Sequence, residues 1–304
     1  MRKWTTADIP SQAGRTAVVT GTGGLGLETA LALARAGADT VVAGRSAEKG
    51  AEAVARISTE VPSARVRFEQ LDLASLASVT AFATRLARRE RKVDLLVNNA
   101  GVMVPPTKRE TEDGFELQFG TNHLGHFALT KQLLPLLGKA TGARVVSLSS
   151  VAARSGVIDL ENLNAEKGYN AMRAYSQSKL ACLMFGLELQ RRSAVGGWGV
   201  TSVIAHPGVA RTDLLHNGPG RRSGMGLTRS LLWFLFQPAA QGALPTLFAA
   251  TSADAEPGGY YGPHALGETR GHPAPARVPP AALDEVVARA LWDASEALIQ
   301  GEVR

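Results

Sequence analysis

Residues 16–26 read TAVVTGTGGLG, a short β-branched run that leads into a glycine turn. Residues 28–36 follow closely, are rich in alanine and leucine, and have good helix propensity. The turn carries the pattern G-x-G-x-x-G at Gly21, Gly23 and Gly26. A glycine backbone can approach a pyrophosphate closely, and the N-terminus of the next helix supplies free N–H groups and a positive dipole end. This segment therefore predicts a strand-turn-helix unit that holds a dinucleotide.

The same alternation of strand-like and helix-like segments continues along the chain. Candidates for buried strands lie at residues 40–43, 66–70, 93–97, 144–148 and 200–205, with helical segments at 47–60, 75–88, 114–137 and 174–192. Near-continuous apolar strands separated by helices imply a parallel sheet that is covered on both faces. The expected fold class is therefore α/β, with a doubly wound parallel sheet of the Rossmann type.

No long linker or internal repeat divides the 304 residues, so we expect a single domain over 1–304. Residues 213–240 interrupt the alternation and are expected to form a helical insertion after the sixth strand, acting as a lid over the substrate. Their aromatic part, residues 231–236, leaves three roles open: lining an apolar pocket, packing on the domain or a second subunit, or weak peripheral membrane contact. A Pro-, Ala- and Arg-rich stretch at 264–280 precedes a last helix at 281–300.

The composition, 45% hydrophobic and 20% charged residues, allows a sizeable core and excludes disordered, collagen-like and coiled-coil chains. Lys and Arg outnumber Asp and Glu by 33 to 27, but no basic stripe with interleaved aromatic residues is present, so no nucleic-acid partner is expected. The single cysteine, Cys182, excludes an intramolecular disulfide and fits a reducing compartment. With no signal-peptide pattern and no apolar run near the roughly 20 residues that span a bilayer, a cytoplasmic protein without a transmembrane segment is expected.

Arg45 occupies a position that selects between nicotinamide cofactors. A site for NAD usually places an acidic residue about 20 residues beyond the glycines, where it binds the ribose 2′-hydroxyl. Here Gly44-Arg45-Ser46 stands at that point. A guanidinium makes charge-assisted, often bidentate bonds to phosphate oxygens, so the sequence predicts NADP(H) over NAD(H).

Tyr175 and Lys179 lie four residues apart in an apolar helical segment, so their side chains leave the same helix face. A nearby ammonium favours the phenolate, as a proton donor to a developing alkoxide requires. Ser149 and Ser150 end the fifth expected strand, and residues 98–101 end the fourth. Ligands of such sheets bind outside the carboxyl ends of the strands, so these groups are expected to meet there.

His123 and His126 are spaced three residues apart on an expected helix. Spacing places no third ligand beside them, so we expect a structural or solvated pair and no metal. Cys182 is expected to be a small, buried hydrophobic residue.

These motifs, taken in order, resemble the set that characterises the short-chain dehydrogenase/reductase family. The resemblance runs from about residue 15 to residue 212. It rests on residues 20–26, Asp72, residues 98–101, Asn122, Ser150, Tyr175 with Lys179, and Pro207-Gly208. Within the family, TNHLGHF at 121–127 and AYSQSKL at 174–180 are similar to the retinol-dehydrogenase-like and protochlorophyllide-reductase-like branch, whose substrates tend to be bulky and apolar.

The resemblance implies a role for each matching residue. Tyr175 is expected to be the general acid/base, with Lys179 supporting it and bonding the nicotinamide ribose. Ser150 is expected to bond the substrate carbonyl oxygen, and Asn122 to hold a water in a proton relay. A homo-oligomer formed through the helices that carry Asn122 and Tyr175 is also implied. The residues expected to bind the cofactor are Gly21, Gly23, Gly24, Leu25, Gly26, Arg45, Asp72, Leu73, Asn99, Ala100, Gly101, Tyr175, Lys179, Pro207, Gly208 and Thr212.

The glycine turn itself departs from the family pattern. The usual T-G-x-x-x-G-x-G is one residue longer than the TGTGGLG at residues 20–26. The missing position often carries a side chain that contacts the adenosine phosphate. Arg45 is then expected to carry more of the 2′-phosphate recognition.

The sequence thus predicts an NADP(H)-dependent oxidoreductase that interconverts a carbonyl and an alcohol on a small, fairly apolar substrate by hydride transfer. Two alternatives stay open. The same Tyr175 and Lys179 can serve a reductase of an activated C=C bond, and the shorter turn is compatible with a non-catalytic NADP(H)-binding scaffold or sensor.

Overall fold

The computed structural model describes residues 3–210 and 237–301. Within them, the strands are β1 (Thr16–Thr20), β2 (Asp39–Gly44), β3 (Val66–Gln70), β4 (Leu95–Asn98), β5 (Ala143–Leu148), β6 (Val200–Ala205), β7 (Tyr260–Ala265) and β8 (Arg270–Pro275). They form one sheet in the order β3-β2-β1-β4-β5-β6-β7-β8. Neighbouring strands pair in parallel except β7 and β8, which are antiparallel. This confirms the expected Rossmann-like α/β fold.

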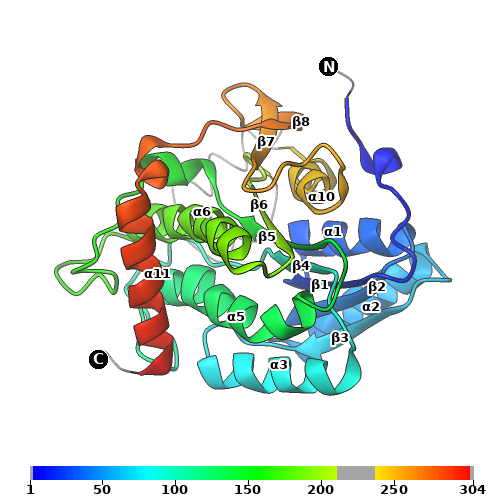
Figure 1. Ribbon diagram of the computed structural model, residues 1–304, viewed down its shortest axis with the longest axis horizontal. Coiled ribbons are helices and arrows are strands. Elements are labelled where there is room, and N and C mark those ends of the chain that lie inside the picture. The colour runs from blue at the N-terminus through cyan, green and yellow to red at the C-terminus, as the bar shows by residue number, and fades with distance from the viewer. Residues whose placement is uncertain (1–2, 211–236, 302–304) are drawn as a thin grey trace.

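The helices of the described residues cover both faces of this sheet (Figure 1). They are α1 (Gly24–Arg35), α2 (Ala47–Glu60), α3 (Leu76–Arg89), α4 (Leu117–Phe119), α5 (Gly125–Leu137), α6 (Ala171–Gly196), α9 (Ala239–Gly242), α10 (Leu244–Thr251) and α11 (Glu285–Gln300), with short turns η1 (Thr6–Asp8), η2 (Gly120–Leu124), η3 (Val151–Ser155) and η5 (Pro280–Leu283). Apolar side chains of α1, α2 and α10 pack on one face, and those of α3, α5 and α6 on the other. The central strands are apolar because both of their faces are buried.

Local sequence explains where the helices begin and end. Ser46 and Ser75 cap α2 and α3 by accepting the backbone N–H three residues on. Asn170 caps α6 in the same way, and Asp284 caps α11. Gly197 ends α6 in the left-handed conformation, with φ of 61°. These caps set the directions in which the helices leave the sheet edge.

The structure corrects two expected segments. The helix expected over 114–137 is divided into α4, the π-helical turn η2 and α5. The Pro-, Ala- and Arg-rich stretch at 264–280, for which no strand is predicted, supplies β8, the second strand of a hairpin. Its prolines are tolerated because β8 is the last strand of the sheet, where the outer edge needs no N–H donor.

The C-terminal helix α11 lies across α5 and α6 (Figure 1). Trp292 is buried there, with ring centroids 4.9 Å from Phe127 and 5.7 Å from Phe185. Arg192 stacks over the indole at 4.5 Å. The family resemblance implies that subunits pair through α5 and α6. In this chain, part of the surface of these two helices is therefore covered by α11.

Thr212 and most of the expected lid, including residues 231–236, lie outside the described residues.

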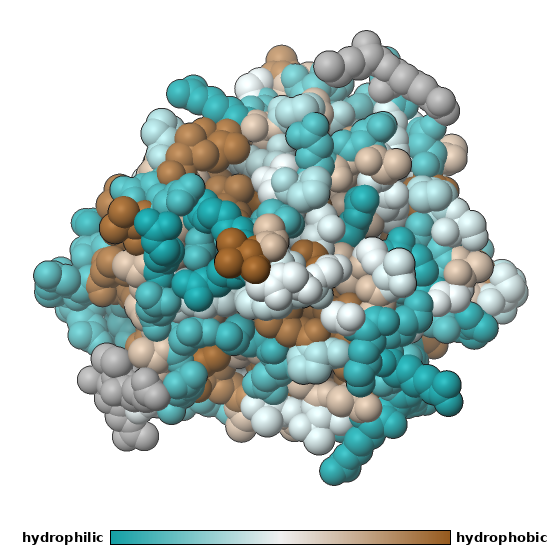
Figure 2. Space-filling model, in the orientation of Figure 1, coloured by the Kyte–Doolittle hydropathy of each residue, from teal (hydrophilic) through white to brown (hydrophobic). Residues whose placement is uncertain are grey.

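On the face shown in Figure 2, hydrophobic patches are small and are separated by hydrophilic side chains. No helix among residues 3–210 and 237–301 is both long and apolar enough to cross a membrane.

Candidate active site

A cleft of about 1160 Å³ opens at the carboxyl ends of the parallel strands. Its walls come from the glycine turn after β1, residues 71–74 after β3, residues 99–103 after β4, and residues 207–210 after β6. Ligands of doubly wound sheets bind at this edge. The sequence-predicted residues that line the cleft are Gly21, Gly23, Gly24, Leu25, Arg45, Asp72, Leu73, Asn99, Ala100, Gly101, Ser150, Tyr175, Lys179, Pro207 and Gly208.

Asn99 holds the glycine turn in shape. Its Nδ2 donates to Thr20 O at 2.7 Å, and its own N–H donates to Thr20 Oγ1 at 2.9 Å. A Cβ on Gly26 would lie 2.5 Å from Gly21 O, so only glycine lets α1 approach the turn this closely. The first N–H groups of α1, beginning with Gly24, have no partner within the helix and stand at the cleft.

Positive charge gathers where β2 meets the cleft. Arg45 is exposed there and makes no ion pair or side-chain hydrogen bond with any residue the structure describes. Lys49, in the first turn of α2, lines the same edge, and its ammonium likewise has no partner among the described residues. Arg56, farther along α2, is engaged by Glu60 at 2.9 Å and Glu28 at 2.8 Å, and these bonds raise its pKa. Sequence reasoning missed Lys49, although it lies in the first turn of the helix expected directly after Arg45.

Asp72 and Leu73 follow β3 and also line the cleft. Asp72 Oδ1 accepts the N–H of Ala74 at 2.9 Å, and the N–H of Asp72 donates to Ser78 Oγ at 3.0 Å. These bonds fix the loop. The second carboxylate oxygen of Asp72 keeps no hydrogen-bond partner among the described residues.

Tyr175 and Lys179 reach the cleft from one face of α6, and both are buried. Lys179 Nζ donates to Leu148 O at 3.1 Å, which uses one of its three hydrogens. The Tyr175 hydroxyl has no hydrogen-bond partner in the described part of the chain. A Cβ on Gly101 would lie 3.0 Å from Asn122 Oδ1, so a side chain at this position of the cleft wall would crowd the Asn122 amide. The pair offers an unengaged phenol beside an ammonium.

The two serines after β5 have different tasks. Ser149 Oγ donates to Lys179 O at 2.8 Å, so its hydrogen is already used. Ser150 Oγ accepts the N–H of Ala152 at 3.2 Å at the start of η3, which leaves its own hydrogen free to donate. Of the two, Ser150 is therefore the one whose hydroxyl hydrogen has no acceptor among the described residues, and its bond to a substrate oxygen stays a prediction from the family resemblance.

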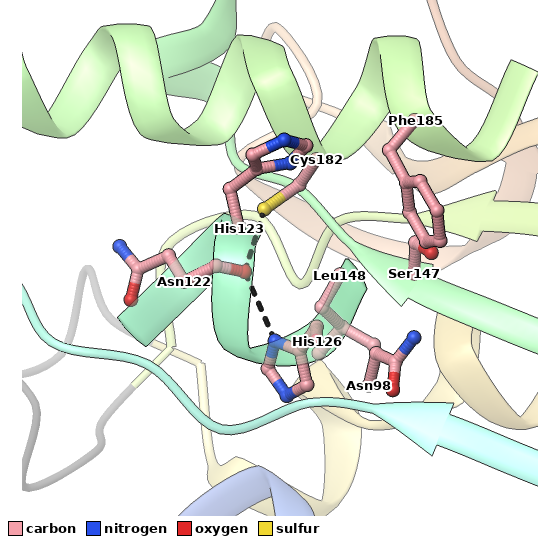
Figure 3. A pocket seen from close by; sticks show the side chains of 8 residues that line it. All are labelled: Asn98, Asn122, His123, His126, Ser147, Leu148, Cys182 and Phe185. Atoms are coloured by element: carbon pink, nitrogen blue, oxygen red, sulfur yellow. Dashed lines mark hydrogen bonds between the residues drawn. The ribbon is translucent and has the colours of Figure 1, made fainter. Parts of the chain in front are cut away.

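Asn122 lies behind the cleft wall and does not line it. Its Oδ1 accepts the N–H of Val102 at 2.8 Å, and its Nδ2 donates to Val102 O and to Ser178 Oγ, both at 3.0 Å. Its main-chain carbonyl accepts from His126 Nδ1 at 2.9 Å and from Cys182 Sγ at 3.1 Å (Figure 3). Asn122 thus joins the segment after β4 to α6. Its expected role in a water relay stays a prediction.

His126 and His123 are buried beside Asn122, so the structural alternative describes them and the solvated one is wrong. Burial lowers the pKa of His126 to about 4, although its hydrogen bond to Asn122 O opposes the shift. Burial also lowers the pKa of His123 to about 3. His126 Nε2 lies 2.9 Å from Thr20 Oγ1, so this neutral ring connects Asn122 to the strand that leads into the glycine turn.

Two predicted site residues that the structure describes are not part of the cleft lining, and a third cannot be placed in it or outside it. Gly26 is buried in the glycine turn, Asn122 lies behind the wall, and Thr212 is outside the described residues. Apolar side chains that sequence reasoning did not single out also line the cleft; they include Val102, Met103, Pro105, Leu117 and Met172. No periodic pattern marks them, because they come from separate loops.

Known proteins resemble this chain along most of its length. The family model described as short chain dehydrogenase matches residues 15–220. Retinol dehydrogenase 13 of Mus musculus is 42% identical over 302 residues, which cover 96% of this chain and 85% of that protein. Polyprenol dehydrogenase of Mus musculus is 42% identical over 290 residues, which cover 93% and 83%. A solved structure of an uncharacterized protein from Mycobacterium paratuberculosis has a TM-score of 0.79 and 39% identity, and the match covers 98% of both chains.

The family match includes the glycine turn, Ser150, Tyr175 and Lys179, the residues that meet around the cleft. Retinol dehydrogenases recur among the similar curated proteins. The chain therefore belongs to the short-chain dehydrogenase/reductase family of oxidoreductases, in its retinol-dehydrogenase-like branch.

Proposed function

We propose that this protein is an NADP(H)-dependent oxidoreductase that interconverts a carbonyl and an alcohol on an apolar substrate, with Tyr175 as general acid/base. The observation that carries the proposal is the cleft itself. It is lined by Tyr175 and Lys179 and also by the cations Arg45 and Lys49, and the described residues offer no partner to the Tyr175 hydroxyl or to these two cations.

The residues of the cleft suit a dinucleotide phosphate. The open N–H groups at the start of α1 and its positive dipole end favour a pyrophosphate beside Gly24. A Cβ on Gly23 would meet nothing within 4 Å, so the space beside this glycine is open to a ligand. Arg45 and Lys49 supply charge for a 2′-phosphate, which supports NADP(H) over NAD(H).

When bound, the nicotinamide supplies or accepts the hydride. Tyr175 donates a proton to the substrate oxygen during reduction and takes it back during oxidation. Lys179, four residues on along the same face of α6, places a positive charge in the cleft with the phenol. Ser150, whose hydroxyl hydrogen is free, donates to the same oxygen and orients it. Asn122 positions the wall behind Lys179 through its bonds to Val102 and Ser178.

An apolar substrate fits the cleft, because several side chains that line it are apolar, among them Met103, Pro105 and Met172. The relatives are named for retinol and polyprenol, which are both apolar isoprenoid alcohols. We therefore propose a long or ring-bearing apolar alcohol or aldehyde as the substrate class.

The first test is a fluorescence titration with NADPH and with NADH, followed by turnover of retinaldehyde and of a linear isoprenoid aldehyde. We expect at least tenfold tighter binding of NADPH, equivalent to about 1.4 kcal/mol. The variant Tyr175→Phe is expected to keep this affinity and to lose turnover by about 10² or more.

Tyr169→Phe is the matched control. Its hydroxyl contacts Gln118 and Pro105 O beside the cleft, and it is expected to leave turnover unchanged. Full turnover by Tyr175→Phe would refute the assigned acid/base. Failure of both cofactors to bind up to millimolar concentration would refute the whole proposal.

Product analysis tests the two alternatives. A saturated carbonyl product would favour the reductase of an activated C=C bond, and tight NADPH binding without any product would favour the scaffold or sensor. The cytoplasmic location expected from the single cysteine stays a prediction. So does a homo-oligomer, and we propose that it would use a face other than the α5 and α6 surface covered by Trp292.

A further inference from the structure

His206, which follows β6, is completely buried at the inner end of the segment that lines the cleft with Pro207 and Gly208. Its Nδ1 lies 3.2 Å from the backbone nitrogen of Gly208. Because a backbone N–H can only donate, Nδ1 is the acceptor and the ring hydrogen stands on Nε2. That Nε2–H donates to Glu268 Oε2 at 2.9 Å. The ring therefore connects the cleft-lining backbone to a carboxylate on a distant loop.

Glu268 is held for this contact from several sides. Its carboxylate also forms an ion pair with Arg154 Nη2 at 2.6 Å and accepts a hydrogen bond from the backbone N–H of Arg277 at 3.0 Å. It stands in the turn between β7 and β8, where Leu266, Gly267 and Glu268 all have positive φ, at 50°, 67° and 68°. A left-handed Glu and a left-handed Leu are uncommon, and such backbone persists only where the surroundings determine it.

The same turn grips the cleft segment at further points. Val209 N–H donates to Thr269 O at 2.8 Å. A Cβ on Gly208, whose φ is +65°, would lie 2.4 Å from Thr269 O, so the two backbones are in close contact. Gln237 Nε2 donates to Pro207 O at 2.6 Å, and its Oε1 accepts the N–H of Gly271 at 3.2 Å. The β7–β8 hairpin thus defines where Pro207 and Gly208 stand.

Room for the imidazole is provided by the strand next to it. A Cβ on Gly262 in β7 would fall 2.0 Å from His206 Nε2, so only glycine fits there. The Tyr260 ring lies 5.2 Å from the imidazole. Burial lowers the pKa of His206, and the bonds to Glu268 from His206, Arg277 and Arg154 outweigh the effect of burial and lower the pKa of that carboxyl to about 2. The neutral ring and the charged carboxylate therefore persist over the ordinary working pH range.

We propose that His206, oriented by Glu268 and Arg154, is a positioning residue that fixes the Pro207–Gly208 backbone at the nicotinamide end of the cleft. The proposal rests on the function proposed above for what the cleft binds. The hydrogen bond itself exists without any ligand. The two hydrogen bonds of the His206 ring can be tested separately. Asn can replace the Nδ1 acceptor, which faces the Gly208 N–H, and Gln can replace the Nε2–H donor, which faces Glu268.

The test compares His206→Asn with His206→Gln in the full chain. The first readout is hydrogen exchange of the backbone N–H of Gly208 without cofactor, by mass spectrometry of peptides that end within the segment. We expect at least tenfold faster exchange in His206→Gln, which loses the acceptor, and a rate within threefold of the unsubstituted protein in His206→Asn. The second readout is the Kd for NADPH, expected to rise about tenfold in His206→Gln and less than threefold in His206→Asn.

Equal exchange rates in the two variants would overturn the proposal, because a ring that only fills space would not distinguish acceptor from donor. Absence of NADPH binding by the unsubstituted protein would refute the proposed function and leave the exchange result to decide the role of His206. Where a His206 variant does not fold, Glu268→Ala replaces it, with Gly208 exchange expected to accelerate at least tenfold and Glu268→Gln expected to restore it. Unchanged exchange in Glu268→Ala would equally overturn the proposal.

Discussion

Acid should destabilise this protein through the two buried histidines behind the active site. His123 donates from Nε2 to Ser295 Oγ at 2.8 Å, because that hydroxyl donates onward to Leu291 O, and its Nδ1 has no partner among the described residues. His126 donates from Nδ1 to Asn122 O. A second proton on His123 Nδ1 would have no acceptor among the described residues, and one on His126 Nε2 would face Thr20 Oγ1, which already accepts the N–H groups of Asn99 and Ala100. Burial accordingly lowers their pKa values to about 3 and about 4.

The sign and size follow from linkage. An unfolded histidine has a pKa of about 6.5, so between that value and the folded pKa the unfolded chain binds more protons. The stability that each neutral, buried histidine contributes is fully present above about pH 6.5. It is lost as the pH falls toward the folded pKa, about 4 for His126 and about 3 for His123. At pH 5 each histidine costs about 2 kcal/mol, from about 1.4 kcal/mol for each pH unit below 6.5. The pair costs about 4 kcal/mol, a large part of a typical stability of 5–15 kcal/mol.

Two other buried groups act in the same pH range. The pKa of His206 is also lowered by burial, so it adds to the loss of stability in acid. Burial raises the pKa of Glu116, although hydrogen bonds from the N–H groups of Phe119 and Gln118 oppose this. Its folded pKa therefore lies above the unfolded value, and Glu116 opposes the loss. The variants below isolate the contribution of His123 and His126 from both.

The assay is urea unfolding at pH 7.5 and pH 5.0. His123→Gln keeps a donor for Ser295, and His126→Asn keeps one for Asn122 O, but neither new side chain titrates. Each variant is expected to reduce the stability difference between the two pH values by about 2 kcal/mol. His264→Gln, at an exposed site in β7, is the control and should keep the full difference. A difference as large in His123→Gln and His126→Asn as in the unsubstituted protein would refute the reasoning.

Four further substitutions test the cofactor end of the cleft, the packing of α11 and the glycine turn. Arg45→Glu removes a charge-assisted bond worth about 1.5–3 kcal/mol, so the affinity for NADPH in a fluorescence titration should fall roughly 10- to 150-fold while the affinity for NADH changes little. The exposed Arg88→Glu is the control. An equal loss of affinity for both cofactors in Arg45→Glu would contradict the assignment. Trp292→Ala should lower the free energy of unfolding by about 3–5 kcal/mol in urea titrations. Val286, which is 70% exposed on the same helix, gives the control Val286→Ala, which should change this free energy by less than about 0.5 kcal/mol. Similar losses in both variants would show that Trp292 does not hold α11 in place. Gly26→Ala should destabilise the fold because its Cβ would lie 2.5 Å from Gly21 O. Gly23→Ala should keep the melting temperature and weaken NADPH binding. A stable Gly26→Ala together with a destabilised Gly23→Ala would refute the assigned geometry of the turn.

Features encoded in neighbouring residues were predictable from the sequence. The glycine turn and β1 follow from composition and local periodicity, and the bounds of β1, β3 and β6 agree with those expected. The shared helix face of Tyr175 and Lys179 follows from their spacing of four residues. The choice of Ser150 over Ser149 came from the family resemblance, and the structure supplies its reason in the hydrogen that Ser149 donates to Lys179 O.

Other features depend on residues far apart in the chain, and only the tertiary structure decided them. The pairing of β7 with β8, the burial of Trp292 on Phe127, and the contact of His206 with Glu268, 62 residues away, leave no periodic pattern that local reasoning can detect. Asn122 was expected in the site, but its position behind the wall depends on Val102 and Cys182 arriving from other elements. The sequence by itself determined which chemical groups stand at the carboxyl edge of the sheet, because strand and helix periods are local. Their partners were decided by packing, because each contact forms only when distant segments are brought together.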